Sequence, residues 1–184
     1  LNDTRHERHH GCTRVMENLY RSLDENQIGI SRVSYLNQDL MSNDLAAALD
    51  SCDFAIVNGE GTIHHGKSYA EDLLRVVANS KATTKVLLNS TYQSNPTHYR
   101  EYLANFDHVY VRDHQSKNEL AGIGIASQVV PDLTFLSQPD SNYPSCPNTL
   151  VGCSVDREVT VHLCKLGRTL GDRARPLSIF NKSE

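Results

Sequence analysis

The chain has 184 residues, of which 39% are hydrophobic and 22% charged, and its 18 Lys and Arg against 22 Asp and Glu give a formal net charge of −4. These fractions are typical of a folded globular protein and disfavour a disordered one. The mildly acidic balance, without a run of Lys or Arg, argues against nucleic acid or an anionic membrane as the main partner. The length corresponds to one domain, or to one domain and part of another.

No stretch approaches the ~20 consecutive apolar residues of a membrane span, and the first residues lack the pattern of a signal peptide, so we expect a cytoplasmic protein. The five cysteines are odd in number, widely spaced and without a C-x-x-C pair. This pattern disfavours both a disulfide framework and a cysteine zinc site. We expect no metal and no cofactor, and we interpret most of the cysteines as small buried side chains.

One pattern repeats along the chain: a segment of helical period, a short β-branched apolar run, and a polar or Gly-rich turn. This alternation is typical of an α/β fold. It predicts a parallel, Rossmann-like sheet with helices on both faces, in which a strand represented only by Leu1 is the first of six. The other expected elements, in chain order, are helix 12–23, strand 29–36, helix 44–51, strand 53–58, helix 68–80, strand 85–90, helix 96–105, strand 107–111, helix 114–122 and strand 126–130.

A composition change follows this first domain, which we place at residues 1–136. Residues 137–148 hold three of the six prolines and little apolar content, as expected of a linker. A strand at 149–153, a helix at about 156–170 and a strand near 177–180 then form one βαβ unit. Such a unit is too small to bury both faces of its own sheet. We therefore expect 149–184 to dock on the first domain, to pair with another chain as a homo-oligomer, or to begin an incomplete second domain.

Polar residues gather where the predicted strands end. In an open parallel sheet, ligands bind beyond the carboxyl ends of the strands, where loops and helix N-termini converge. Histidine, carboxylate and arginine side chains therefore meet at one rim of this sheet. The rim residues that we select as candidates for binding or catalysis are Asp3, Thr4, His10, Gly59, Glu60, Gly61, His64, His65, Arg112 and Ser116.

The loop 59–66 is the sharpest local feature of the rim. Gly59 and Gly61 would let backbone N–H groups approach a ligand oxygen closely, which makes the loop a candidate anion cradle. It is not a dinucleotide fingerprint, because His64 stands where the third glycine would be, and it lacks the lysine of a P-loop. The alternative is a tight strand-to-helix turn that needs its glycines only for backbone conformation.

Arg112 follows a predicted strand and precedes a helix whose expected N-cap is Asp113. A fixed guanidinium and the positive end of a helix dipole would suit a carboxylate or a phosphate. Ser116 would donate to the same anion or simply occupy the first helical turn. The alternative for Arg112 is a surface arginine paired with an acid such as Glu119.

Nine histidines is a high count, and the adjacent His64 and His65 fall at the rim, where an imidazole can act as acid or base near neutral pH. For each single histidine, exposure or packing remains the alternative. His6, His9 and His10 would bring two rings together only on a helix, so a metal site has little support.

Taken in order, the rim motifs resemble those of the polysaccharide pyruvyl transferases. The resemblance covers residues 1 to about 136. The matching segments are Asn2-Asp3-Thr4 with His10-Gly11-Cys12, residues 53–61 with His64-His65, residues 86–91, Val111-Arg112-Asp113 with Ser116, and Val130-Pro131-Asp132.

The resemblance implies that this chain is the N-terminal half of a GT-B-like two-domain architecture with its active site in the cleft. The implied reaction transfers a pyruvyl group from phosphoenolpyruvate, the donor substrate, to two hydroxyls of a sugar in a surface or capsular polysaccharide (exopolysaccharide). In that reaction Arg112 and Ser116 would clamp the anion, while Glu60, His64 and His65 would act as acid or base. Asp3, Thr4 and His10 would line the acceptor side.

Two departures from the family pattern bear on this reading. Members of the family are about twice this length, and their C-terminal cationic and histidine motif has no counterpart after residue 149. The alternatives are a non-catalytic or truncated binding protein that keeps the fold, and a glycosyltransferase with a nucleotide-sugar donor, since fold alone does not fix function.

Overall fold

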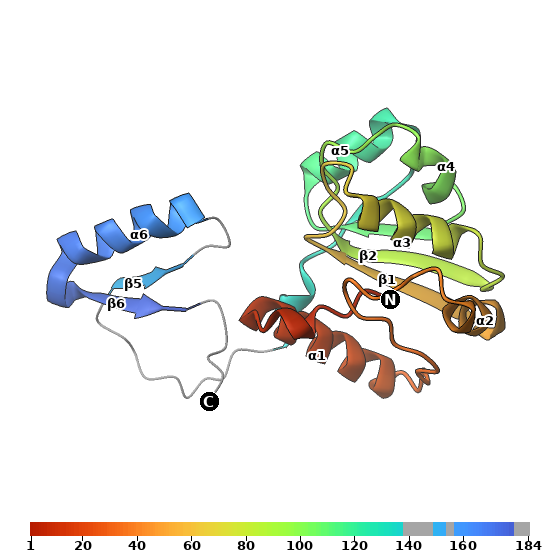
Figure 1. The fold of residues 1–184 in the computed structure, drawn as a ribbon, viewed down its shortest axis with the longest axis horizontal. Helices are drawn as coiled ribbons and strands as arrows, with labels where there is room; N and C mark the ends of the chain where they lie inside the picture. The colour runs from red at the N-terminus through yellow and green to blue at the C-terminus, as the bar shows by residue number, and fades with distance from the viewer. Residues whose placement is uncertain (138–148, 154–156, 179–184) are drawn as a thin grey trace.

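The computed structural model describes residues 1–137, 149–153 and 157–178, and its largest sheet has four parallel strands in the order β1-β2-β3-β4 (Figure 1). This confirms the α/β alternation. The strands are β1 (Phe54–Glu60), β2 (Thr84–Ser90), β3 (His108–Val111) and β4 (Gln128–Val129). The helices are α1 (His10–Glu25), α2 (Asn43–Ser51), α3 (Ser68–Ala78), α4 (Tyr99–Leu103) and α5 (His114–Gly122), with 3-10 turns η1 (Arg5–Glu7) and η2 (Leu133–Leu136).

Helices cover both faces of this sheet, as predicted. Side chains alternate between the two faces of a strand, and neighbouring residues of β2 accordingly join different apolar clusters. Leu87 belongs to the larger cluster, with side chains of α2, α3, α4 and α5, whereas Leu88 packs with Val15, Met16 and Leu19 of α1. Figure 1 shows α1 on one side of the sheet and α3, α4 and α5 on the other.

The prediction of a strand over 29–36 is wrong. Residues 28–34 form no strand, and only Tyr35 pairs, through an isolated parallel bridge to Asp3. A strand exists only where a neighbouring backbone satisfies its N–H and C=O groups. Here that neighbour is short: the Asp3 N–H donates to the Ser34 carbonyl and the Leu36 N–H donates to the Asp3 carbonyl.

The segment Leu1–Asp3 lies between Tyr35 and β1 and bonds to both. On the β1 side, the amino group of Leu1 donates to the Ile56 carbonyl and the Asn58 N–H donates to the Leu1 carbonyl. The chain leaves Asp3 towards α1 on one face and leaves β1 towards α3 on the other. The strand order therefore reverses between Asp3 and β1, and such a topological switch point is where open α/β sheets bind ligands.

A second, two-stranded parallel sheet is formed by β5 (Thr149–Gly152) and β6 (Ala174–Leu177). Helix α6 (Arg157–Leu170) and a 3-10 turn η3 (Gly171–Arg173) connect them, and α6 contacts both strands. This confirms the predicted βαβ unit, although its last strand begins earlier, at Ala174. Nearly all of the predicted linker, residues 138–148, lies outside the described residues. None of the helices in the described ranges is both long and apolar enough to cross a membrane.

Candidate functional site

The carboxylate of Glu60 stands at the switch point, at the end of β1. The Thr4 hydroxyl donates to Glu60 Oε2 at 2.5 Å, across the point where the strand order reverses, and the Asn58 side-chain amide donates to the same oxygen at 3.1 Å. Cys12 lies in the first turn of α1, and burial, together with the nearby Glu60 carboxylate, raises the pKa of its thiol to about 12. Cys12 is therefore a neutral thiol near pH 7 and is not poised to act as a nucleophile.

Three buried asparagines support this carboxylate. The Asn2 side-chain amide donates to the Asn58 carbonyl at 2.7 Å, and the Asn89 amide donates to Asn58 Oδ1 at 3.2 Å. Asn2, Glu60 and Asn89 all have left-handed backbone conformations, with φ of 64°, 37° and 55°. Such conformations are uncommon outside glycine, cost about 1–3 kcal/mol each and collect at functional sites. Their concentration at the carboxyl ends of β1 and β2 marks this edge as the candidate site.

Arg112, directly after β3, connects the ends of the neighbouring strands. Its Nη1 donates to Asp132 Oδ2 at 2.6 Å, and its Nη2 donates to Thr91 Oγ1 at 2.6 Å and to the Glu60 carbonyl at 3.3 Å. The partner acid is thus Asp132 rather than Glu119, whose carboxylate instead accepts the Ser94 N–H. The side chain of Arg112 stays 26% exposed, so it is not sealed off from solvent.

Ser116 is buried and fully engaged within the fold. Its hydroxyl donates to Asp113 Oδ2 at 2.9 Å and accepts the Tyr92 N–H at 2.9 Å, while its own N–H donates to Asp113 Oδ1. Asp113 is the N-cap of α5, as predicted. Ser116 therefore fastens the loop after β2 to the start of α5, which corresponds to the structural alternative for this residue.

The two glycines of the 59–66 loop have different surroundings. Gly59 lies inside β1, where a Cβ atom would stand 2.5 Å from the Cβ of Ser90 on β2. Gly61 follows the strand, and no atom lies within 4 Å of the position of its Cβ. The glycine at 59 is thus required by strand packing, whereas Gly61 opens onto free space at the rim.

The adjacent histidines lie on the turn between β1 and α3. His64 Nδ1 and His65 Nδ1 are 2.7 Å apart, and Lys67 Nζ lies 2.8 Å from His64 Nε2. Burial, then the positive charge of Lys67 and the neighbouring His65, lower the pKa of His64, so this imidazole is neutral near pH 7. His10 is exposed at the first residue of α1.

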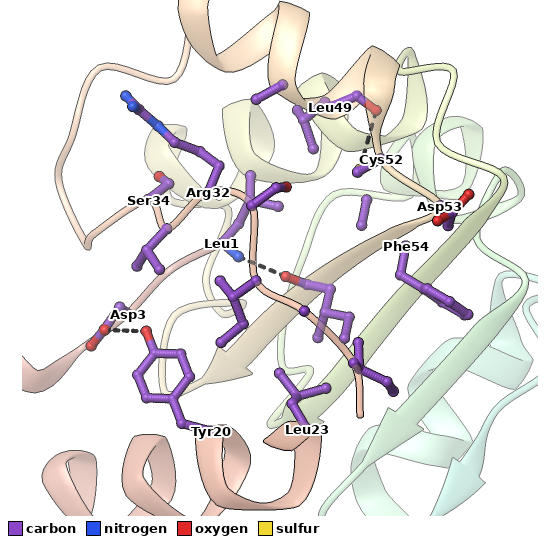
Figure 2. Close-up of a pocket in the computed structure, with 18 of the residues that line it drawn as sticks. Leu1, Asp3, Tyr20, Leu23, Arg32, Ser34, Leu49, Cys52, Asp53 and Phe54 are labelled. Atoms are coloured by element: carbon purple, nitrogen blue, oxygen red, sulfur yellow. Dashed lines mark hydrogen bonds between the residues drawn. The ribbon is translucent and has the colours of Figure 1, made fainter. Parts of the chain in front are cut away.

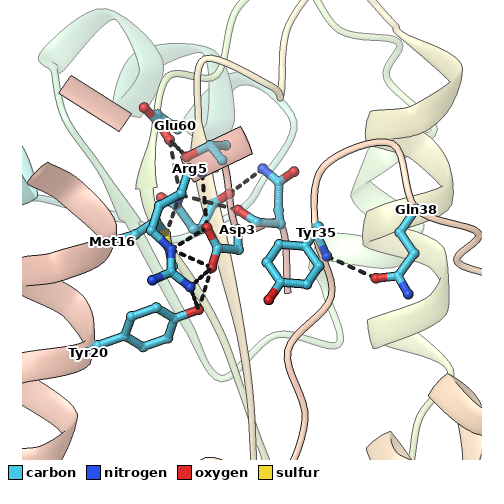
Figure 3. Close-up of polar contacts among 10 residues, drawn as sticks. Asp3, Arg5, Met16, Tyr20, Tyr35, Gln38 and Glu60 are labelled. Atoms are coloured by element: carbon cyan, nitrogen blue, oxygen red, sulfur yellow. Dashed lines mark hydrogen bonds and ion pairs between the residues drawn. The ribbon is translucent and has the colours of Figure 1, made fainter. Parts of the chain in front are cut away.

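Asp3 is only 1% exposed, and its carboxylate serves the fold. Arg5 donates to both oxygens from Nε and Nη2, and the Tyr20 hydroxyl donates to Oδ2 at 2.6 Å. Figure 3 shows Asp3 beside Arg5 and Tyr20, and Glu60 with its own hydrogen bonds in the same view. Asp3 thus fastens the segment before η1 to α1 and leaves Thr4 facing Glu60.

The pairing of Asp3 predicts a specific loss of stability in acid. Burial alone would raise the pKa of Asp3, but the hydrogen bonds from Arg5 and Tyr20 outweigh it and hold the pKa below 3.8. A depressed folded-state pKa contributes stability above the unfolded-state value and loses it as the pH falls through the folded-state value. We expect Asp3→Asn to lower the free energy of unfolding at pH 6. At pH 3 the difference in free energy of unfolding between this variant and the wild type should be smaller. Urea unfolding at both pH values measures this.

The matched control is Asp24→Asn, at an exposed position near the end of α1. It should change the free energy of unfolding by less than about 0.5 kcal/mol at either pH. A gap between Asp3→Asn and the wild type that is equal at pH 6 and pH 3 would contradict the ionic role of Asp3.

A cavity of about 420 Å³ lies away from the Glu60 edge, between α1, the segment 27–34, α2 and β1. Figure 2 shows Leu1, Leu23, Leu49 and Phe54 around it, with the hydrogen bond from Tyr20 to Asp3 at one end. Its wall mixes aliphatic side chains with polar ones such as Arg32 and Asp53, and of the candidate residues only Asp3 lines it. The other candidate residues lie elsewhere, so the candidate site stays at the ends of β1, β2 and β3.

Four positions that the structure brings to this edge were not predicted from the sequence: Asn58, Asn89, Lys67 and Cys12. Asn58 and Asn89 are polar residues within otherwise apolar strands, and this is the signal that could have identified them. Lys67 gave no signal, because its contact with His64 depends on how the turn folds. Cys12 lies in the resembling segment, yet its position beside Glu60 follows only from the packing of α1.

Comparison with known proteins gives one match. Residues 5–182 match the family model described as polysaccharide pyruvyl transferase. No curated protein and no solved structure matches the chain. The match includes the β5-α6-β6 unit and so extends beyond the segment in which the rim motifs lie.

Proposed function

The chain belongs to the polysaccharide pyruvyl transferase family, a family of transferases, and from that premise we propose that it transfers a pyruvyl group from phosphoenolpyruvate to a sugar of a surface polysaccharide. Two sugar hydroxyls add to the central carbon of the donor, its methylene carbon takes a proton to become a methyl group, and inorganic phosphate leaves. The product is a pyruvate ketal. The reaction needs a base for the hydroxyl protons, an acid for the methylene and donors for the leaving phosphate.

Glu60 is the residue that we assign as the base. The observation that carries the proposal is its position: its side chain is held at the switch point by Thr4 and Asn58, and its backbone carbonyl is held by Arg112. A carboxylate fixed by positioned donors keeps the geometry that proton transfer requires. Thr4, which bridges to it, is assigned to the acceptor side.

Arg112 is the residue that we assign to the donor. Arg112 lies at the carboxyl end of β3 with a partly exposed side chain, and phosphoenolpyruvate carries both a carboxylate and a phosphate, for which a guanidinium provides directed N–H groups. Because Asp132 already neutralises part of this charge, donor binding calls for further positive groups. The imidazole pair His64 and His65, with the neighbouring Lys67, lies on the turn that follows Glu60 and is assigned to that side.

The test is donor binding and phosphate release by the wild type and by Glu60→Gln. Saturating phosphoenolpyruvate should raise the melting temperature of both proteins by roughly 5–10 °C. A ligand at about 100 times its dissociation constant adds ~2.7 kcal/mol to the free energy of unfolding. Phosphate release should require added methyl hexosides as acceptors and should fall at least a hundredfold in Glu60→Gln. This pattern would support binding through this edge and base catalysis by Glu60.

Two outcomes would contradict the proposal. A thermal shift with a uridine diphosphate sugar and none with phosphoenolpyruvate would favour a nucleotide-sugar glycosyltransferase. Undiminished phosphate release by Glu60→Gln would remove Glu60 as the base. Glu71→Gln is the control, because Glu71 bonds Tyr102 and His98 away from the Glu60 edge, and it should keep both binding and release.

A further inference from the structure

The turn between β1 and α3 carries three basic nitrogen groups in a line. Lys67 Nζ lies 2.8 Å from His64 Nε2, and His64 Nδ1 lies 2.7 Å from His65 Nδ1. Because His64 is neutral near pH 7, its ring accepts a hydrogen bond from the Lys67 ammonium, and the positive charge of the line lies on Lys67. Within the described ranges no ion pair connects any of the three to a carboxylate.

The backbone holds this line in place. His65 has a left-handed conformation with φ of 55°, and its N–H donates to the Gln93 carbonyl. Asn95 accepts the Gly66 N–H and donates to the Ile63 carbonyl, so both sides of the histidine pair are fastened. An imposed backbone strain in a tied turn is a feature of sites in which side chains are pre-positioned.

The contacts also determine where the protons lie. An ammonium group can only donate, so Nε2 of His64 accepts from Lys67 and the proton of a neutral His64 sits on Nδ1. That N–H then donates to Nδ1 of His65, whose own proton must sit on Nε2. The line therefore begins at a positive charge on Lys67 and ends with an N–H donor on the exposed His65 ring.

We propose that Lys67, His64 and His65 form an oxyanion-binding site in which Lys67 supplies the charge and His65 Nε2–H the terminal hydrogen bond. The ligand class is a phosphate or phosphate ester, and its identity as the phosphate of the donor rests on the proposed function. The site lies next to Glu60 along the chain, because His64 is on the turn that follows β1, and the backbone of Gly61 lies close to the His64 ring. It supplies the positive charge that Asp132 removes from Arg112.

The test uses the full chain with inorganic phosphate as the probe. Imidazole ¹⁵N resonances should show His64 protonated on Nδ1 and His65 on Nε2 at pH 8. Phosphate should shift the resonances of His65 in a saturable way. Lys67→Gln should weaken phosphate binding threefold to tenfold and move the His64 proton towards Nε2, because glutamine no longer imposes an acceptor role on that nitrogen.

The control is Lys81→Gln, since Lys81 is exposed and pairs with Asp50, away from the turn that carries the histidines. It should leave both the phosphate affinity and the tautomers unchanged. Failure of phosphate to perturb either ring, or an unchanged affinity in Lys67→Gln, would overturn the proposal. These measurements involve no pyruvyl transfer, so phosphate binding without transfer would reject only the proposed function, and transfer with a phosphate affinity insensitive to Lys67 would reject only this site.

Discussion

Gly59→Ala is expected to destabilise the protein by at least about 3 kcal/mol. The new Cβ would stand 2.5 Å from the Cβ, 2.6 Å from the Oγ and 2.9 Å from the Cα of Ser90, distances at which the two strands must separate. Strand β2 cannot move away freely, because it pairs with β1 on one side and with β3 on the other. Overpacking normally costs ~1–3 kcal/mol, and a clash that includes backbone lies at the upper end or beyond. Urea unfolding followed by circular dichroism measures the loss.

Two further variants separate this clash from a general effect of replacing glycine. The Cβ atom added by Gly61→Ala would have no atom within 4 Å, so the free energy of unfolding should stay within about 1 kcal/mol of the wild-type value. Reduced freedom of the unfolded chain should add a small gain in stability. The double variant Gly59→Ala with Ser90→Gly removes the serine side chain and should recover part of the loss. If Gly59→Ala were as stable as Gly61→Ala, the close approach of β1 and β2 would be refuted.

Arg112→Ala is expected to lower the free energy of unfolding by about 2–3 kcal/mol and the melting temperature by roughly 5–10 °C. The change leaves Asp132, Thr91 and the Glu60 carbonyl without their shared donor. The partial exposure of Arg112 and Asp132 limits the cost to less than that of a fully buried pair. In Arg112→Ala the rise in melting temperature on adding phosphoenolpyruvate should also be lost, because the guanidinium assigned to the donor is removed.

Arg75 offers a matched control. It also contacts an aspartate at 2.6 Å, Asp72, but both side chains are more than 40% exposed, so Arg75→Ala should cost no more than about 0.5 kcal/mol. Arg112→Lys keeps the positive charge but lacks the planar guanidinium with its several N–H donors. Its melting temperature should fall between those of the wild type and Arg112→Ala. Equal melting temperatures for Arg112→Ala and Arg75→Ala would show that Arg112 does not connect the strand ends.

Much of the fold could be predicted because its signals are local. The periodicity of α1 and α3, the N-cap Asp113 of α5 and the apolar run of β2 each depend on residues a few positions apart. Such patterns determine which face of an element is apolar, and burying those faces on a sheet yields the α/β layers. The prediction of polar residues at the carboxyl ends of the strands follows from the same rule.

The partners of those polar residues could not be predicted, because each choice depends on contacts between distant parts of the chain. Arg112 had several acids available to it, and only the path of the chain after β4 places Asp132 at its Nη1. Residues 29–36 have the composition of a strand, yet pairing reaches only Tyr35, since a ladder needs a neighbouring backbone.

The sequence by itself determined the order and type of most of the elements and the edge at which polar residues gather, because helix and strand periodicity is a short-range property. Tertiary structure alone decided what each residue does at that edge: Gly59 makes room for Ser90, Asp3 is held by Arg5 and Tyr20, and Glu60 is left facing the rim. The physical reason is that packing and hydrogen bonding assign partners by position in space, and spacing along the chain does not specify that position.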